Sequence, residues 1–268
     1  MKIEVFVGAL MLSVGVVSAD IIDDFESYTI GSVPGGIWQD ASSFISNPTN
    51  PGPTVSVIGT NDANGNATRA VQINDGIGSS GGLIAGVSTS ATQRFEIDVR
   101  LDQQGNGSAP NWMTAIGFVQ NTVQDDFNWM PQAFVYASGN GRFRLFVQNA
   151  DGQGSASRDF GLNGGVWSMD TWYRVALEAD TVNGVFDVTI TDLVSGNVTA
   201  DISRTYAGWN SDFGMYDLVS VNDGAYGNNP GSIGNMSSYD NAAYTPAPGV
   251  LMVLGCSGLI ATRRQRAG

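Results

Sequence analysis

The sequence predicts an all-β chain that folds as two packed antiparallel sheets. Apolar residues alternate with polar ones in short runs between residues 21 and 244, which is the period of a half-buried strand. Gly, Asn, Asp and Ser interrupt these runs, and no segment shows the period of an amphipathic helix. About a dozen strands with this density of turns require two sheets, one packed on the other.

The strand candidates follow one another along the whole central segment. They are residues 21–28, 54–58, 67–73, 93–101, 113–120, 132–137, 142–148, 172–179, 185–191, 198–203, 216–221 and 237–244. In residues 93–101, four apolar side chains alternate with four charged ones, which indicates a sheet with one face in water. The apolar ones are Phe95, Ile97, Val99 and Leu101, and the charged ones are Arg94, Glu96, Asp98 and Arg100.

Dipeptides that end in glycine separate several of the strand candidates. Gly adopts positive φ without steric cost and Asn tolerates it, so such pairs favour tight hairpin turns. The pairs are Asn64-Gly65, Asn140-Gly141, Asp151-Gly152, Asn183-Gly184 and Ser195-Gly196. The sequence therefore predicts hairpins at these five places.

The composition excludes several classes of function. The chain has no histidine, which removes Ser-His-Asp hydrolysis, Cys-His catalysis and histidine-based metal sites. It carries 25 acidic and 12 basic residues, for a net charge of −13, so binding to nucleic acid or to an anionic membrane surface is disfavoured. The one cysteine, Cys256, lies in an apolar tail, so no disulfide stabilises the central segment. Divalent cations and neutral polymers remain as the expected partners.

Both ends of the chain carry targeting patterns. Lys2, an apolar stretch over residues 5–17 and the small residues 17–19 predict a secretory signal peptide cleaved before Asp20. At the other end, residues 246–268 combine a Pro-Ala-Pro motif, an apolar run and an arginine-rich end. Residues 20–245 are then the expected mature domain, of a size that suits one large all-β unit.

The C-terminal pattern resembles the PEP-CTERM sorting signal, which a membrane exosortase is thought to process in Gram-negative bacteria. The resemblance rests on Pro246, Ala247, Pro248 and the basic residues Arg263, Arg264 and Arg266, and Ala247 stands where the family usually has Glu. The apolar run is short against the roughly 20 residues of a spanning helix, which favours a transient signal over a permanent membrane anchor. Both alternatives place the exported protein at the cell envelope or in the extracellular matrix.

Four further segments resemble LamG-like, concanavalin A-type jelly-roll domains of exported bacterial proteins. They are Asp23-Asp24-Phe25-Glu26-Ser27-Tyr28; Gly31-Ser32-Val33-Pro34-Gly35-Gly36 with Trp38; Trp172-Tyr173-Arg174-Val175; and Tyr239-Asp240-Asn241-Ala242. The resemblance implies a two-sheet jelly roll, often with a structural calcium ion and sometimes with carbohydrate on the concave face. By the same resemblance, Asp24, Glu26 and Asp240 are the expected calcium ligands. As alternatives, these carboxylates are edge-strand charges that discourage aggregation, and Asp62 to Asn66 is a weaker calcium loop or a plain hairpin tip.

Aromatic side chains next to polar loops are candidates for stacking on sugar rings. Trp112, Trp129 and Trp209 flank such loops, and Tyr136 and Arg144 are expected beside them on central strands. Burial in the core is the alternative for each of these residues. The leading hypothesis is therefore a surface or matrix protein that is not an enzyme and binds polysaccharide. A structural or adhesive coat protein without a glycan ligand is the rival.

An atypical glycoside hydrolase is the remaining alternative. Glu96 and Asp98 resemble part of the Glu-x-Asp-x-(x)-Glu strand pattern of family 16 glycoside hydrolases. The position of the general acid is Arg100, which cannot donate a proton at neutral pH. We therefore expect this segment to be an ordinary strand with a charged outer row.

Overall fold

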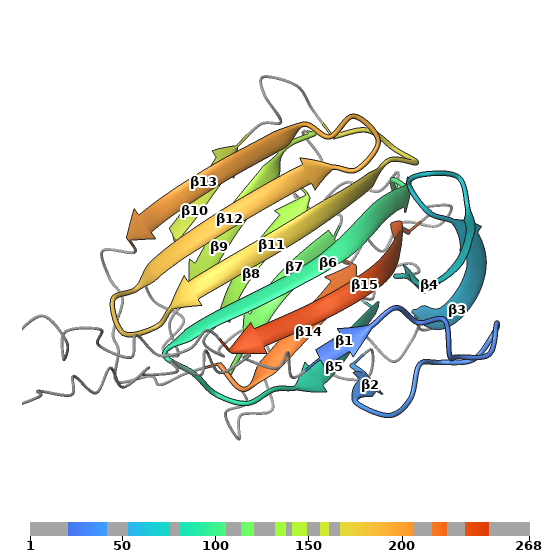
Figure 1. Cartoon of the computed structure of the whole chain (residues 1–268), viewed down its shortest axis with the longest axis horizontal. Helices are drawn as coiled ribbons and strands as arrows, with labels where there is room; N and C mark the ends of the chain where they lie inside the picture. The colour runs from blue at the N-terminus through green and yellow to red at the C-terminus, as the bar shows by residue number, and fades with distance from the viewer. Residues whose placement is uncertain are drawn as a thin grey trace, which may run out of the picture.

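The structure, a computed structural model, contains fifteen strands and no helix in the residues that it describes (Figure 1). These residues are 21–41, 53–75, 81–105, 114–120, 132–137, 141–148, 156–160, 167–205, 216–223 and 234–246. The strands are β1 (Ile21–Asp23), β2 (Trp38–Asp40), β3 (Thr54–Asn61), β4 (Ala67–Asn74), β5 (Gly81–Gly86), β6 (Thr92–Gln103), β7 (Thr114–Val119), β8 (Gln132–Ala137), β9 (Phe143–Gln148), β10 (Ala156–Phe160), β11 (Trp172–Asp180), β12 (Val185–Asp192), β13 (Val198–Thr205), β14 (Leu218–Asp223) and β15 (Met236–Pro246). Among the described residues, no helix is long and apolar enough to cross a membrane.

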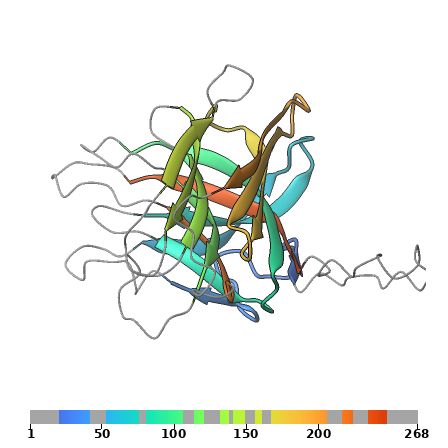
Figure 2. The same ribbon diagram turned by 90° about the vertical axis from the view of Figure 1, so that its left-hand side faces the viewer.

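The strands form two antiparallel sheets that pack face to face (Figure 2). The eight-stranded sheet has the order β13-β12-β11-β6-β15-β4-β3, and β1 also pairs with β15. The seven-stranded sheet has the order β10-β9-β8-β7-β14-β5-β2. The predicted all-β jelly-roll sandwich is confirmed.

The core lies between the two sheets and consists of the inward-pointing residues of each strand. Phe95, Ile97, Val99 and Leu101 of β6 are all 0% exposed, as the alternation in residues 93–101 predicts. From the other sheet, Phe118 of β7 stacks on Tyr216 with ring centroids 5.4 Å apart. Burial of these apolar side chains is the main favourable term in folding.

Four of the five predicted hairpin glycines have positive φ in the structure. Gly65, Gly141, Gly184 and Gly196 have φ values between 63° and 83°. All four lie between strands that pair directly, since β3 pairs with β4, β8 with β9, β11 with β12 and β12 with β13. The fifth pair, Asp151-Gly152, lies outside the described residues.

The sequence missed three strands and made one too long. β2, β5 and β10 were not predicted, and β5 is hidden by its glycines. A Cβ on Gly81 would lie only 2.7 Å from Cγ2 of Ile73, so close packing at this strand requires glycine. The predicted strand over residues 21–28 ends at Asp23, because Phe25 has a φ of 56° and its carbonyl accepts a turn hydrogen bond from the Tyr28 amide.

Candidate functional site

The outer face of the seven-stranded sheet, here called the seven-strand face, carries a second apolar cluster. Its residues alternate with core residues on the same strands, so they point away from the core. The cluster consists of Ala115, Val119, Phe134 and Tyr136, with the partly buried Phe146 and Leu218 packed against it. The four residues are 0–8% exposed, so the cluster is itself buried, and only Phe146 and Leu218 are partly exposed. A buried apolar cluster on an outer sheet face differs from the usual solvated face, and it marks this side of the sandwich as a candidate binding surface.

Tyr136 and Arg144, two predicted ligand contacts, are neighbours on this face. They are direct partners on β8 and β9. The guanidinium carbon of Arg144 lies 5.7 Å from the centroid of the Tyr136 ring, and Nη1 donates a hydrogen bond of 3.4 Å to the tyrosine hydroxyl. Tyr136 is only 8% exposed, whereas Arg144 and Phe146 are partly exposed. Tyr136 therefore supports Arg144 from below, and Arg144 and Phe146 present the accessible surface.

Two buried polar groups on the same face have no partner. Ser220 and Asn222 of β14 are 1% and 3% exposed. Within the described residues, Ser220 Oγ and Asn222 Nδ2 form no hydrogen bond. Such a group costs about 1–3 kcal/mol when it stays unsatisfied, so it favours any ligand or water that offers a partner.

Small residues flank these two polar groups in the sheet. Ala115 and Gly82 are the partners of Asn222 on the two neighbouring strands, and Gly117 is a partner of Ser220. The other partner of Ser220, on β5, is the larger Ile84. Ser220 alternates with Val219 and Val221 in the predicted strand 216–221, and this alternation could have indicated that Ser220 points away from the core.

The remaining predicted sugar contacts, Trp112, Trp129 and Trp209, lie outside the described residues. Trp172 and Tyr173, which are consecutive residues of β11, are both buried, at 4% and 2% exposure. Phe146 was not predicted. In the predicted strand 142–148, Phe146 alternates with the core residues Phe143, Leu145 and Val147, and this alternation could have placed it on the outer face.

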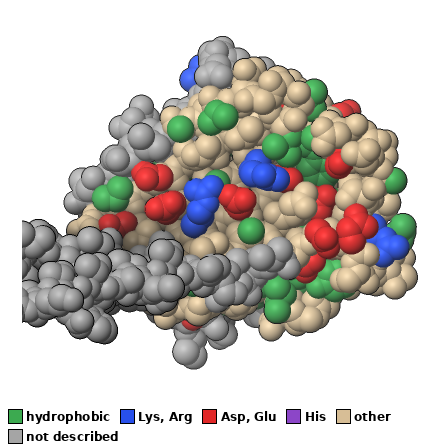
Figure 3. Space-filling view, viewed as in Figure 1, with side chains coloured by type: hydrophobic (Ala, Val, Ile, Leu, Met, Phe, Trp, Pro, Cys, Tyr) green, Lys and Arg blue, Asp and Glu red, His purple; other side chains and the backbone are tan. Residues whose placement is uncertain are grey.

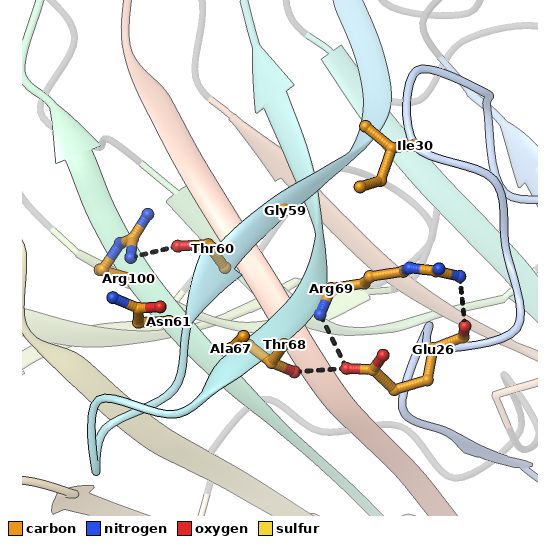
Figure 4. A pocket seen from close by; sticks show the side chains of 9 residues that line it. All are labelled: Glu26, Ile30, Gly59, Thr60, Asn61, Ala67, Thr68, Arg69 and Arg100. Atoms are coloured by element: carbon orange, nitrogen blue, oxygen red, sulfur yellow. Dashed lines mark hydrogen bonds between the residues drawn. The ribbon is translucent and has the colours of Figure 1, made fainter.

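Two of the three predicted calcium ligands are brought together by a threonine. The Thr68 hydroxyl lies 2.7 Å from Oε1 of Glu26 (Figure 4). It also lies 3.2 Å from Oδ2 of Asp240. Asp24 does not share a strand face with Glu26 as expected, because the strand ends at Asp23. Its Oδ1 instead accepts a hydrogen bond of 3.1 Å from the Glu26 amide in an exposed turn.

The chemistry of this pair fits a hard cation such as calcium. Carboxylate and hydroxyl oxygens are the ligands that calcium prefers. Asp240 is 3% exposed, and no arginine or lysine of the described residues pairs with it. Burial is the main cause that raises the pKa of Asp240 to about 7, and the charges of Asp98 and Glu26 raise it further. Within the described residues, however, no group of three or more His, Cys, Asp or Glu side chains could hold a metal ion.

Asp98 and Glu96 each form an ion pair with an arginine. Asp98 accepts hydrogen bonds of 2.7 and 2.9 Å from Arg174 and one of 3.0 Å from Nδ2 of Asn241. Glu96 lies 2.8 Å from Nη2 of Arg94. The expectation of an ordinary strand with a charged outer row is confirmed.

The weaker calcium loop is a hairpin tip. Oδ1 of Asp62 accepts hydrogen bonds from the amides of Asn64 and Asn66, and its Oδ2 accepts one from the Asn66 side chain. These bonds hold the pKa of Asp62 below its usual value. Both carboxylate oxygens of Asp62 therefore accept hydrogen bonds within the turn.

Comparison with known proteins shows the fold and nothing finer. No protein-family model matches the sequence, and no curated protein matches it. The cellulose-induced protein Cip1 is similar in structure, with a TM-score of 0.51 and 16% identity over 84% of this chain and 96% of that one. The winged bean acidic lectin, solved with methyl-alpha-D-galactose, has a TM-score of 0.49 and 8% identity over 78% of this chain and 98% of the lectin. A sialidase has a TM-score of 0.47 and 12% identity, and 79% of this chain corresponds to only 17% of the sialidase.

Proposed function

We propose that this chain is an exported, surface- or matrix-directed protein that is not an enzyme and binds polysaccharide on its seven-strand face. The observation that carries the proposal is the combination of an apolar cluster with Ser220 and Asn222, whose polar atoms lack partners. A sugar ring has an apolar face and a rim of hydroxyl groups. It can pack on Phe146 while its hydroxyls satisfy buried polar groups of this kind.

The test is retention on four neutral polysaccharides, namely mixed-linkage glucan, xylan, galactomannan and dextran. We expect the folded protein to bind at least one of them. Phe146→Ala and Asn222→Ala should each weaken binding about tenfold, as truncation of a central contact does. Arg94→Ala, on the outer face of the other sheet, is the matched control and should bind normally.

Folded protein that binds none of the four polymers would contradict the proposal. The rival, a structural or adhesive coat protein whose partner is another protein, would then be preferred. Equal loss of binding in Phe146→Ala and Arg94→Ala would keep carbohydrate binding but place it elsewhere on the molecule.

We propose further that Glu26 and Asp240 hold a structural calcium ion, with Thr68 and backbone oxygens beside them. Calcium would link the segment that follows β1 to β4 and β15, so its removal should lower the melting temperature. Asp240→Asn should abolish the sensitivity to chelator, whereas Asp62→Asn, in the hairpin tip, should retain it. An unchanged melting curve on adding chelator would exclude the ion.

The export and sorting segments lie outside the described residues, apart from Pro246, which is the last residue of β15. We propose that residues 1–19 are removed on export and that an exosortase-type enzyme processes residues 246–268. Mass spectrometry of the surface protein should then show neither Met1 nor the residues from Arg263 to Arg266. An intact arginine-rich end would favour a permanent membrane contact through the apolar segment.

A further inference from the structure

A hollow of about 610 Å³ lies where β3 and β4 meet the hairpin turn that joins them (Figure 4). Its lining includes Glu26, Ile30, Asn61, Arg69 and Arg100. This volume is within the range of about 300–1,000 Å³ that is usual for ligand sites. The hollow contains none of the residues of the seven-strand face.

The charged groups of the hollow are already held in place. Oε1 of Glu26 accepts hydrogen bonds of 2.7 Å from both the Thr68 hydroxyl and the Arg69 amide. Nη1 of Arg69 donates bonds of 2.6 and 2.7 Å to the carbonyls of Glu26 and Tyr28. A ligand would therefore not have to order these long side chains, which removes a cost of about 0.5–1.5 kcal/mol for each.

These fixed groups keep unused hydrogen-bonding capacity. Within the described residues, Oε2 of Glu26, Nη2 of Arg69 and the side-chain amide of Asn61 form no hydrogen bond. Glu26 is also a proposed calcium ligand, so the groups that remain for a sugar are Nη2 of Arg69, a cationic donor, and the Asn61 amide, which can donate and accept.

Ile30 adds an apolar wall beside these polar groups. Its side chain is 58% exposed, and its Cδ1 would lie 3.3 Å from a Cβ placed on Gly59. It therefore stands over the ribbon of β3 and β4, next to Arg69 (Figure 4). An apolar wall next to paired donors and acceptors matches a sugar ring with adjacent hydroxyl groups.

We propose that this hollow is a second carbohydrate-binding site for neutral glycans, so that one protein molecule cross-links two polysaccharide chains. This inference rests on the proposed function, because the first chain binds the seven-strand face. The two sites lie on different sheets, since the hollow is formed at β3 and β4 of the eight-stranded sheet and the first site is the outer face of the seven-stranded sheet (Figure 1). A short glycan in one site leaves the other free. The net charge of −13 disfavours polyanionic chains.

The test separates binding from cross-linking. The full-length protein is added to the same four polysaccharides in soluble form, and particle size is followed by light scattering while affinity gel electrophoresis reports binding. We expect the wild type to bind and to raise the particle size. Ala67→Trp fills the hollow from an exposed position, and Phe146→Ala removes a contact of the seven-strand face. Each variant should still bind through its other site but should not raise the particle size. Val182→Trp adds the same bulk at a residue that is 58% exposed and lines neither site, so it should behave as wild type.

Two results would overturn the second site and leave the proposed function intact. One is wild-type protein that binds without raising the particle size, and the other is Ala67→Trp that cross-links as well as wild type. Failure of the wild type to bind any of the four polymers would overturn both proposals. If Ala67→Trp does not fold, Asn61→Ala replaces it, because this variant removes the unused amide without adding bulk. An Asn61→Ala protein that folds and cross-links normally would count against the second site.

Discussion

The outer faces of the two sheets differ sharply, although both inner faces are apolar. The outer face of the eight-stranded sheet, here called the eight-strand face, carries alternating charges along β6 and β11 (Figure 3). Its ion pairs are Arg94 with Glu96, Arg100 with Asp102 and Arg174 with Asp98, at 2.6–2.8 Å. The seven-strand face has an apolar cluster and two buried polar groups without partners.

This difference shows which face is merely in contact with water. A charged row with its partners in place is an ordinary solvated surface, and each exposed pair contributes little to stability. On the seven-strand face, the buried polar atoms without a hydrogen bond cost stability until a ligand or a water molecule satisfies them. Function is therefore expected on the seven-strand face.

The largest effect should come from the apolar cluster itself. Phe134→Ala on the seven-strand face removes a side chain that is 1% exposed, so it should lower the free energy of unfolding by about 3–5 kcal/mol. Arg94→Ala on the eight-strand face should lower it by less than about 1 kcal/mol, because the Arg94 side chain is 42% exposed. Urea denaturation measures both. Similar values for the two variants would mean that the faces do not differ in the way described.

Asp240 is an exception on the eight-strand face, because it is a nearly buried carboxyl. Its pKa of about 7 in the folded protein lies above its unfolded value of 3.8, so the folded state keeps the proton up to a higher pH than the unfolded chain does. Between about pH 4 and pH 7 the folded state binds more protons, and stability should fall as the pH rises. The fall is on the order of a few kcal/mol, at about 1.4 kcal/mol for each pKa unit.

The pH effect is measured by urea denaturation at several pH values in the presence of chelator. Asp240→Asn cannot ionise, so its stability should not show this fall. Asp62→Asn provides a control on the same side of the molecule, since the pKa of Asp62 is lowered and not raised. A pH profile of Asp240→Asn that matches the wild type would contradict the assignment.

A smaller effect is expected at the pair of Arg174 and Asp98. Arg174→Ala leaves Asp98, which is 4% exposed, with only the hydrogen bond from Asn241. The loss should be about 1–2 kcal/mol, less than for a fully buried pair, because the Arg174 side chain is 43% exposed and partly screened. Thermal or urea unfolding would show it. A loss as small as that of Arg94→Ala would place this pair with the ordinary surface pairs.

Local patterns were enough to predict most of the strands and hairpins. The alternation in residues 93–101 identified β6, and the Asn183-Gly184 pair identified the turn between β11 and β12. Such signals depend on neighbours in the sequence, so they survive without knowledge of the fold. β5 escaped because its glycines serve close packing against Ile73 and β14, which lie far away in the sequence.

The candidate sites were predicted only in part for the same reason. Tyr136 and Arg144 were expected beside the three tryptophans on central strands, and their contact with each other follows from the pairing of β8 with β9. Thr68 was not connected with Asp240, since 172 residues separate them and only the pairing of β4 with β15 brings them together. Ser220 and Asn222 look like ordinary polar strand residues until their lack of partners is seen.

The sequence by itself determined that the chain is an all-β sandwich, acidic and without histidine, because strand alternation, turn residues and charge are local properties. The tertiary structure alone decided which outer face is apolar and which polar groups lack partners. It also decided that Glu26 and Asp240 meet at Thr68, while Asp24 turns away. These features depend on the order of strands within each sheet, which long-range packing selects and which no short stretch of sequence records.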